Sequence, residues 1–180
     1  MKQFYSFKID IEPQPLQFQF SWNDTSRLTR VSWNEESNDG VESNPPYAVA
    51  AIAREIKNYF RQGEPLLPLH WDLIDSSSLS DFAKKVYETI LLIPHGETRT
   101  YAWVAEKMGK PLAARAVGQA LRRNPFPILI PCHRVVADKS LGGFMGSDDP
   151  EQVELQFKGW LISHEREYIN PSFPFMLKSS

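Results

Sequence analysis

One cysteine and the histidine beside it could carry chemistry in this sequence. Cys132 is the single cysteine among 180 residues, and His133 follows it directly. A thiol attacks an electrophile only as the thiolate, which an imidazole or a nearby cation favours. Adjacent side chains in an extended segment point to opposite faces, however, and a lone cysteine is commonly a small buried hydrophobic residue. The pair alone therefore leaves both interpretations open.

A second chemical feature is the surface of the helix predicted from Pro111 to about Arg122. Arg115, Gln119 and Arg122 recur at i, i+4 and i+7 and form one polar stripe. Small residues beside the stripe leave the backbone nearly bare: Ala113, Ala114 and Gly118. This surface suits close approach to a phosphate-lined groove. The helix taken alone fits a solvated helix with small residues packed on a neighbour more readily.

Charge is distributed unevenly around that helix. The chain has 20 Lys and Arg against 22 Asp and Glu, a net charge of −2, which argues against a protein that coats nucleic acid generically. Between Arg99 and Arg134, however, seven basic residues stand against Glu106 alone, a net charge of +6, and the rest of the chain carries −8. The basic residues are Arg99, Lys107, Lys110, Arg115, Arg122, Arg123 and Arg134. A basic patch is therefore predicted within an acidic average.

Several classes of protein are excluded. A single cysteine permits no intramolecular disulfide and no cysteine-built zinc site, and the four histidines lack ligand spacing, so we expect no metal and no cofactor. The first residues lack the apolar core of a signal peptide, and no run approaches the ~20 apolar residues of a membrane helix. We expect a protein without membrane association, cytoplasmic or, in a eukaryote, nuclear.

The first part of the chain is predicted to form strands followed by a helix. The β-rich runs are Phe4–Ile11, Leu16–Trp22 and Leu28–Trp33. Residues 34–46 are polar and predict a surface loop. A helix is predicted to begin near Pro46, with apolar residues at helical spacing: Val49, Ile52, Ile56 and Phe60. Residues 62–75 are rich in proline and predict a linker, which ends an N-terminal α/β domain of residues 1–75.

The second part is predicted to be mainly helical. A helix capped by Ser80 or Asp81 is followed by a short helix that Thr100 caps, then by a turn at Gly109 and the helix that starts at Pro111. Two short helices joined by a glycine turn are typical of a helix-turn-helix. Ile128–Ile130 is predicted to be buried, Leu141–Gly146 to be a loop, and Val153–His164 to be a last amphipathic helix.

In combination these residues resemble the O6-alkylguanine–DNA alkyltransferase family. The matching segments are IPHGETRTY (93–101), RAVGQA (115–120), Asn124-Pro125, IPCHRVV (130–136), Trp160-Leu161 and Glu165. The resemblance covers about residues 80–165 and implies an α+β protein. Its expected parts are a ribonuclease-H-like N-terminal domain (1–75), a DNA-binding and alkyl-acceptor domain with a winged-helix-like helix-turn-helix (76–165) and a tail (166–180).

The resemblance implies direct-reversal repair of DNA, in which each protein molecule acts once. Cys132 would take the alkyl group from O6-methylguanine, and from O4-methylthymine, and keep it. His133 would accept the thiol proton through a water, and Glu165 would orient the imidazole. Three further matches are Tyr101, which would donate a hydrogen bond or proton to the base, Asn124, which would brace the nucleophile turn, and Lys158, a further active-site residue.

The expected partner is double-stranded DNA, bound by a monomer in the minor groove. The alkylated base must leave the duplex to reach a buried thiol, and Arg115 matches the residue that fills its place. The remaining DNA-binding residues are expected to be Ala113, Ala114, Gly118, Gln119, Arg122 and Arg123. The carbonyls of Cys132 and Val135 would receive the guanine amino group. The pocket wall is expected to comprise Leu121, Pro127, Phe144 and Met145.

Some residues depart from the family pattern. Phe144 stands where tyrosine is common, and the segment from Phe144 to Phe157 is longer than usual and acidic, which puts the range of alkyl groups in doubt. The zinc sites of some relatives are not expected, because no N-terminal cysteine cluster is present. Three alternatives are a sensor that binds alkylguanine without reacting, a helix-turn-helix regulator and a cysteine hydrolase. The sensor is disfavoured because such proteins replace the acceptor cysteine.

Overall fold

A computed structural model describes residues 3–10, 15–33, 41–145 and 151–169. Within these residues the chain divides into two compact units. The first comprises the chain up to Ser78 together with residues 125–129, and the second comprises residues 79–124 and 130–169. The acidic stretch at 146–150, within the long segment that the sequence singles out, lies outside the described residues.

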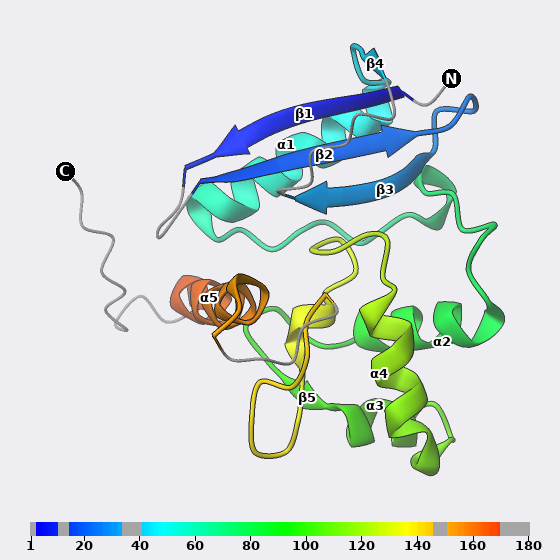
Figure 1. Cartoon of the computed structure of the whole chain (residues 1–180), viewed down its shortest axis with the longest axis vertical. Helices are drawn as coiled ribbons and strands as arrows, with labels where there is room; N and C mark the ends of the chain where they lie inside the picture. The colour runs from blue at the N-terminus through cyan, green and yellow to red at the C-terminus, as the bar shows by residue number, and fades with distance from the viewer. Residues whose placement is uncertain (1–2, 11–14, 34–40, 146–150, 170–180) are drawn as a thin grey trace. The chain divides into compact units, whose positions relative to one another are not determined.

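The first unit is built on a four-stranded sheet (Figure 1). Its strands are β1 (Gln3–Ile9), β2 (Leu16–Trp22), β3 (Leu28–Trp33) and β4 (Val41–Glu42), in the order β3-β2-β1-β4. The first three pair antiparallel, as short connections require, and β4 runs parallel to β1. The alternation in β2 puts Phe18 and Phe20 in the core. The three predicted strands are confirmed within one or two residues over the part of them that is described.

The helix α1 (Tyr47–Gln62) covers one face of this sheet (Figure 1). Its predicted apolar stripe is buried, and the ring of Phe60 lies 5.2 Å from that of Phe18. The helix ends at Gly63, whose φ of +74° lets its N–H bond the carbonyl of Tyr59 at 2.9 Å. The predicted helix after Pro46 is confirmed.

Two parts of the first unit differ from the prediction. Val41–Glu42 forms β4 inside the predicted loop, and the predicted linker contains a 3₁₀ turn, η1 (Trp71–Leu73). Ile74 then bridges to Leu28, and the Asp75 N–H bonds the Leu28 carbonyl at 2.7 Å, so the end of the linker belongs to the sheet unit. A pairing of one or two residues uses backbone groups alone and leaves no side-chain pattern to detect.

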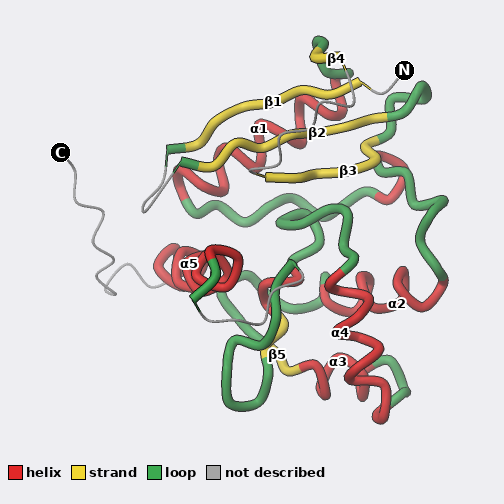
Figure 2. Tube along the Cα trace, viewed as in Figure 1, coloured by secondary structure: helices red, strands yellow, loops and turns green. Residues whose placement is uncertain are grey.

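The second unit is mainly helical (Figure 2). Its elements are α2 (Asp81–Ile90), β5 (Arg99–Thr100), α3 (Tyr101–Lys107), η2 (Pro111–Ala113), α4 (Ala114–Arg122), η3 (Cys132–Arg134), β6 (Val135–Val136) and α5 (Val153–Ile169). The predicted caps are present: the Ser80 hydroxyl accepts from the Ala83 N–H, and the Thr100 hydroxyl accepts from the Trp103 N–H. Gly109 turns the chain between α3 and η2 at a φ of +72°.

Two predicted helices have different limits. The helix expected from Pro111 starts as the 3₁₀ turn η2 and becomes α-helical only at Ala114. The final helix does not end at His164 but continues to Ile169, so the predicted tail from Arg166 begins inside α5. The polar residues after His164 hid this continuation, because Glu165 among them is buried by pairing and not by hydrophobicity.

Two backbone features set up the region around Cys132. The strands β5 and β6 pair in parallel, with Arg99 opposite Val135, which brings the start of α3 beside the chain that follows the cysteine. Before the cysteine, residues 125–129 belong to the first unit, where the Val31 N–H bonds the Pro125 carbonyl at 2.8 Å and Phe126 is buried. Among the described helices, none combines the length and apolar character needed to cross a bilayer.

Candidate active site

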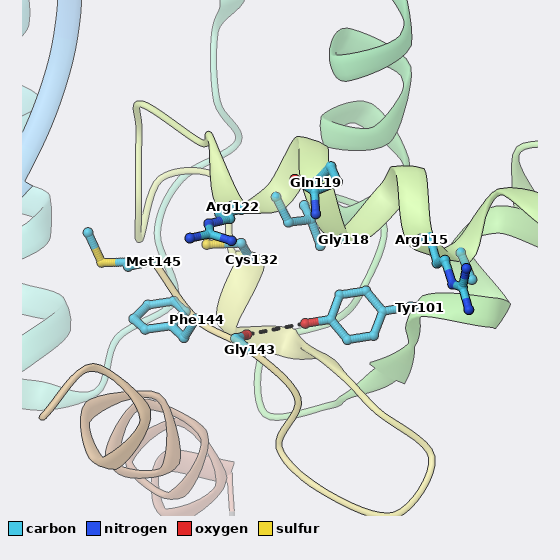
Figure 3. Close-up of a pocket in the computed structure, with 11 residues that line it drawn as sticks. Tyr101, Arg115, Gly118, Gln119, Arg122, Cys132, Gly143, Phe144 and Met145 are labelled. Carbon is cyan, nitrogen blue, oxygen red and sulfur yellow. Dashed lines mark hydrogen bonds between the residues drawn. The ribbon is translucent and has the colours of Figure 1, made fainter. Parts of the chain in front are cut away.

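The thiol of Cys132 lies at the first residue of η3, at the wall of a pocket of about 480 Å³ (Figure 3). The residue is 5% exposed. The pocket is lined by Tyr101, Ala114, Arg115, Gly118, Gln119, Leu121, Arg122, Cys132, Gly143, Phe144 and Met145. Cys132 thus borders a cavity that residues of the basic helix α4 also line.

The surroundings of Cys132 act on its acidity in opposite directions. Burial raises the pKa of the thiol, whereas the Asn124 amide and the Lys158 ammonium lower it. The Asn124 Nδ2 donates to Sγ at 3.3 Å. Burial is the largest of these influences, so the resting group is a thiol that needs a base before it can attack.

That base is available in His133, whose side chain is fully buried. Its Nε2 lies 2.7 Å from Oε1 of Glu165. A carboxylate accepts, so the proton of the neutral imidazole is placed on Nε2, and Nδ1 keeps its lone pair. Nδ1 is buried and has no hydrogen-bond partner among the described residues. Burial lowers the pKa of His133, which keeps the ring neutral and able to accept a proton.

Glu165 is 1% exposed and its carboxylate is fully engaged. Besides His133 it accepts from Arg134 Nε, at 2.9 Å to Oε2, and from the Gly96 N–H at 2.9 Å. Burial by itself would raise the pKa of Glu165, but His133 and Arg134 outweigh it and hold the pKa below its usual range. A permanently charged carboxylate therefore orients the imidazole.

Asn124 closes the loop that leads to the nucleophile. Its Nδ2 donates to the Ile130 carbonyl at 2.9 Å as well as to the Cys132 sulfur. The Cys132 N–H bonds the same Ile130 carbonyl at 2.7 Å. One amide group therefore holds both ends of the turn and contacts the reactive atom.

Tyr101 lies on another wall of the pocket, where its hydroxyl donates to the Gly143 carbonyl at 3.2 Å (Figure 3). Burial raises the pKa of Tyr101 to about 12, so the hydroxyl keeps its proton and remains a donor. The ring packs on Gly142, where a Cβ would lie 2.8 Å from Cε2 and where φ is +67°. Gly142 thus permits the close approach that fixes the phenol.

Lys158 is fully buried behind the same wall. Its Nζ donates to the carbonyls of Val135 at 2.6 Å and Gly143 at 3.0 Å. Burial lowers its pKa to about 8, and Cys132 acts in the opposite direction. The ammonium group therefore ties the chain after the nucleophile to the lining residue Gly143.

The basic helix presents the predicted stripe. Arg115, Gln119 and Arg122 all line the pocket, and Ala114 and Gly118 leave space between them. Ala113 and Arg123, predicted to bind DNA, lie at the two ends of this helix and are not among the lining residues. Leu112 in the preceding turn is 99% exposed.

Three of the residues predicted to form the pocket wall line this cavity: Leu121, Phe144 and Met145. Pro127 does not: it belongs to the segment 125–129 of the first unit, which sequence distance from Cys132 could not reveal. Val135 is also absent from the lining, and its carbonyl is already bonded to Lys158.

Three contributors were missed from the sequence. Arg134 and the Gly96 N–H bind Glu165, and the Gly143 carbonyl receives both Tyr101 and Lys158. Two of the three are backbone groups, which sequence patterns do not mark. Arg134 had a signal, because it directly follows the candidate pair Cys132-His133. No group of three His, Cys, Asp or Glu that could hold a metal occurs in the described part of the chain.

These features define a class of α/β protein in which a buried cysteine, with a histidine and a carboxylate behind it, opens toward an exposed basic helix. Residues 81–167 match the family described as 6-O-methylguanine DNA methyltransferase, DNA binding domain. The chain is 35% identical over 139 residues to the constitutive methylated-DNA–protein-cysteine methyltransferase of Bacillus subtilis, covering 76% of each chain. It is 38% identical to the Mycolicibacterium paratuberculosis protein of that name, covering 73% of this chain and 72% of the other.

Two solved structures are similar to this chain over most of its length. The crystal structure of Mycobacterium tuberculosis O6-methylguanine methyltransferase superimposes with a TM-score of 0.68 at 29% identity, covering 92% of this chain and 94% of the other. A structure of the protein OGT from that organism in complex with DNA matches with a TM-score of 0.62 at 28% identity, covering 93% and 97%. The chain belongs to the methylated-DNA–protein-cysteine methyltransferase family.

Proposed function

We propose that the protein repairs O6-alkylguanine in DNA by moving the alkyl group irreversibly to Cys132, so that each molecule acts once. The observation that carries this proposal is a set of three groups: a thiol at the pocket wall, the buried imidazole of the next residue in the same turn, and a charged carboxylate 2.7 Å from that imidazole. Nucleophile, base and orienting group stand in that order. Membership of the family supplies the substrate.

The reaction transfers one carbon group and one proton. The Cys132 thiol loses its proton through a water to Nδ1 of His133. The thiolate sulfur then attacks the alkyl carbon, and the S–C bond forms as the C–O6 bond breaks. The electron pair of the broken bond stays with the purine, which takes up a proton and becomes guanine. The products are S-alkylcysteine and repaired DNA.

The neighbouring residues assist departure of the base and hold the nucleophile. Tyr101, which stays protonated, donates a hydrogen bond or proton to the leaving purine. Asn124 stabilises the thiolate through its bond to sulfur. Lys158 holds the Val135 and Gly143 carbonyls, so the guanine amino group shares the Val135 carbonyl with it and pairs with the Cys132 carbonyl.

DNA binding falls to α4 and the turn before it. Arg115 is exposed and lines the pocket, and it can occupy the place that a flipped base leaves in the stack. Gln119, Arg122 and Arg123 follow along the helix, and the small residues Ala113, Ala114 and Gly118 allow the backbone to enter the minor groove. Leu121, Phe144 and Met145 receive the extruded base and its alkyl group.

The finer description of the chain is part of the same proposal. We assign the first unit, predicted from the sequence as residues 1–75, to a ribonuclease-H-like domain, and the second unit, predicted as residues 76–165, to a winged-helix-like helix-turn-helix domain. The α3–η2–α4 order supports the helix-turn-helix. The protein is proposed to act as a monomer on double-stranded DNA, in the cytoplasm or a nucleus, and to accept O4-methylthymine as well.

Intact mass spectrometry tests the function directly. The full chain is mixed with a duplex that contains one O6-methylguanine, and Cys132→Ser serves as the matched variant. We expect a gain of one CH₂ per molecule, located on the Cys132 peptide, and no gain in the variant. DNA binding without any adduct would indicate a sensor or a regulator. Continued turnover beyond one equivalent would indicate a hydrolase.

A further inference from the structure

Arg134 makes the densest set of contacts behind the nucleophile. Its Nε lies 2.9 Å from Oε2 and 3.2 Å from Oε1 of Glu165, and its Nη2 lies 3.1 Å from Oε1. The remaining nitrogen, Nη1, donates to the Ile93 carbonyl at 2.8 Å. The guanidinium is therefore fixed by a backbone group on one side and grips both carboxylate oxygens on the other.

These contacts with Arg134 determine which carboxylate oxygen of Glu165 faces His133. The two side chains that bind the carboxylate come from one 3₁₀ turn, since Arg134 directly follows His133 in η3. With Oε2 held by the guanidinium and by the Gly96 N–H, only one rotation of the carboxylate remains, and it directs Oε1 to His133 Nε2. A carboxylate so fixed keeps the imidazole in the tautomer whose Nδ1 accepts the thiol proton.

The guanidinium also supplies charge. The groups around the imidazole are Cys132 and Arg134 in its own turn, Glu165 and Lys158 from α5, and His95, whose Nδ1 lies 3.7 Å from Glu165 Oε1. Glu165 favours the protonated imidazole, whereas Arg134 and Lys158 oppose it. Arg134 is the cation that also neutralises Glu165 by direct contact.

We propose that Arg134 is a positioning residue of the alkyl transfer: it fixes the Glu165 carboxylate so that Oε1 faces His133, and it takes up part of the negative charge that would otherwise act on the imidazole. This inference rests on the proposed function, because it concerns the same proton transfer. It assigns Arg134 to the reaction and removes it from the DNA-binding charge, since the side chain is 11% exposed.

Two substitutions separate the geometry from the charge. Arg134→Gln removes the charge, and Arg134→Lys keeps it but loses the two-pronged grip. The readout is the single-turnover rate of methyl transfer from an O6-methylguanine duplex between about pH 5 and pH 9, where the acid limb reports the base. Arg166→Gln, at an exposed arginine next to Glu165, is the matched control.

We expect the acid limb of Arg134→Gln to move upward by about one pH unit, because a neighbouring positive charge is lost. Arg134→Lys is expected to react about 10-fold more slowly with its acid limb at the native pH. An unmoved or lowered limb in Arg134→Gln overturns the inference, and so does a native rate in Arg134→Lys. If Arg134→Gln does not fold, the rate of Arg134→Lys alone decides.

The two proposals fail in different ways. If the native protein acquires no methyl group from the duplex, the proposed function fails and no rate profile exists. If the native protein is methylated on Cys132 while both Arg134 variants reproduce its profile, the function stands and the role of Arg134 is refuted. Arg166→Gln must give the native pH profile. An equal shift of the acid limb in that variant would show that the effect comes from the overall charge of the protein.

Discussion

Replacing Asn124 with Ala tests how far one amide controls the nucleophile. The substitution removes the donor that lies 3.3 Å from the Cys132 sulfur. It leaves the turn bonded, because the Ile130 carbonyl still accepts from the Cys132 N–H at 2.7 Å. The change also removes the Asn124 Nδ2 bond to the Ile130 carbonyl, but that carbonyl keeps the Cys132 N–H, so the change acts on the thiolate more than on the backbone.

The size of the effect follows from that single contact. A hydrogen bond to a charged group contributes about 1.5–3 kcal/mol, which corresponds to a rise of about one to two units in the thiol pKa. The thiolate fraction at neutral pH then falls about 10- to 100-fold. A more basic thiolate is also more nucleophilic, with a Brønsted slope of about 0.4–0.5, so the net loss of rate is about 3- to 16-fold.

The assay is the single-turnover reaction with free O6-alkylguanine base, which needs no base flipping, followed from neutral to alkaline pH. The loss should disappear once the pH exceeds the raised thiol pKa. The matched control is Asn23→Ala, since Asn23 makes comparable side-chain bonds to Asp75 and Thr25 in the first unit. A loss that is equal at every pH, or no loss at all, would refute the reasoning.

Three further outcomes are expected. Arg115→Ala should slow repair of duplex DNA far more than reaction with the free base, as paired single-turnover rates would reveal; equal losses would contradict the flipping role. Tyr101→Phe should slow transfer by about 10²- to 10⁴-fold without altering the final stoichiometry. The Gly143 carbonyl keeps a hydrogen bond in this variant, because Lys158 still donates to it. An unchanged rate constant would exclude Tyr101 from the mechanism. Burial lowers the pKa of His133 from 6.5, so just below pH 6.5 the unfolded chain binds more protons than the folded protein. The free energy of unfolding should therefore fall on acidification, by at most about 1.4 kcal/mol per pH unit. Denaturant unfolding of native protein and His133→Gln at two pH values checks this, and equal pH dependence would disprove it.

The basic segment from Arg99 to Arg134 shows where counting charges in the sequence predicts the binding surface and where it does not. Arg115 and Arg122 line the pocket as the spacing predicts. Arg134 belongs to the same segment by sequence, yet its side chain pairs with Glu165 and is only 11% exposed, and Arg99 pairs with Glu97. Helical spacing predicts neighbours on one helix, but a pairing with a residue 31 positions away depends on how η3 packs against α5. The positive charge available for DNA is therefore smaller than the net +6 of this segment.

The conformation of the Cys132-His133 pair was also only partly predictable from the sequence. The sequence suggested an extended segment, in which the two side chains would diverge, whereas both lie in a 3₁₀ turn. The family resemblance predicted the link between His133 and Glu165, and their side chains meet at 2.7 Å. The Gly143 carbonyl was not predictable in this way, because its role depends on backbone direction in a loop.

The segment 125–129 has a consequence for anyone who wishes to divide this protein. It belongs to the first unit, although the chain on both sides of it belongs to the second, so the two units are interleaved and are not successive cassettes. Cutting after Ser78 would strip Phe126 and Ile128 of the surroundings that bury them and leave the Val31 N–H without its carbonyl. Fragments made by such a cut should therefore be produced together and recovered as a pair.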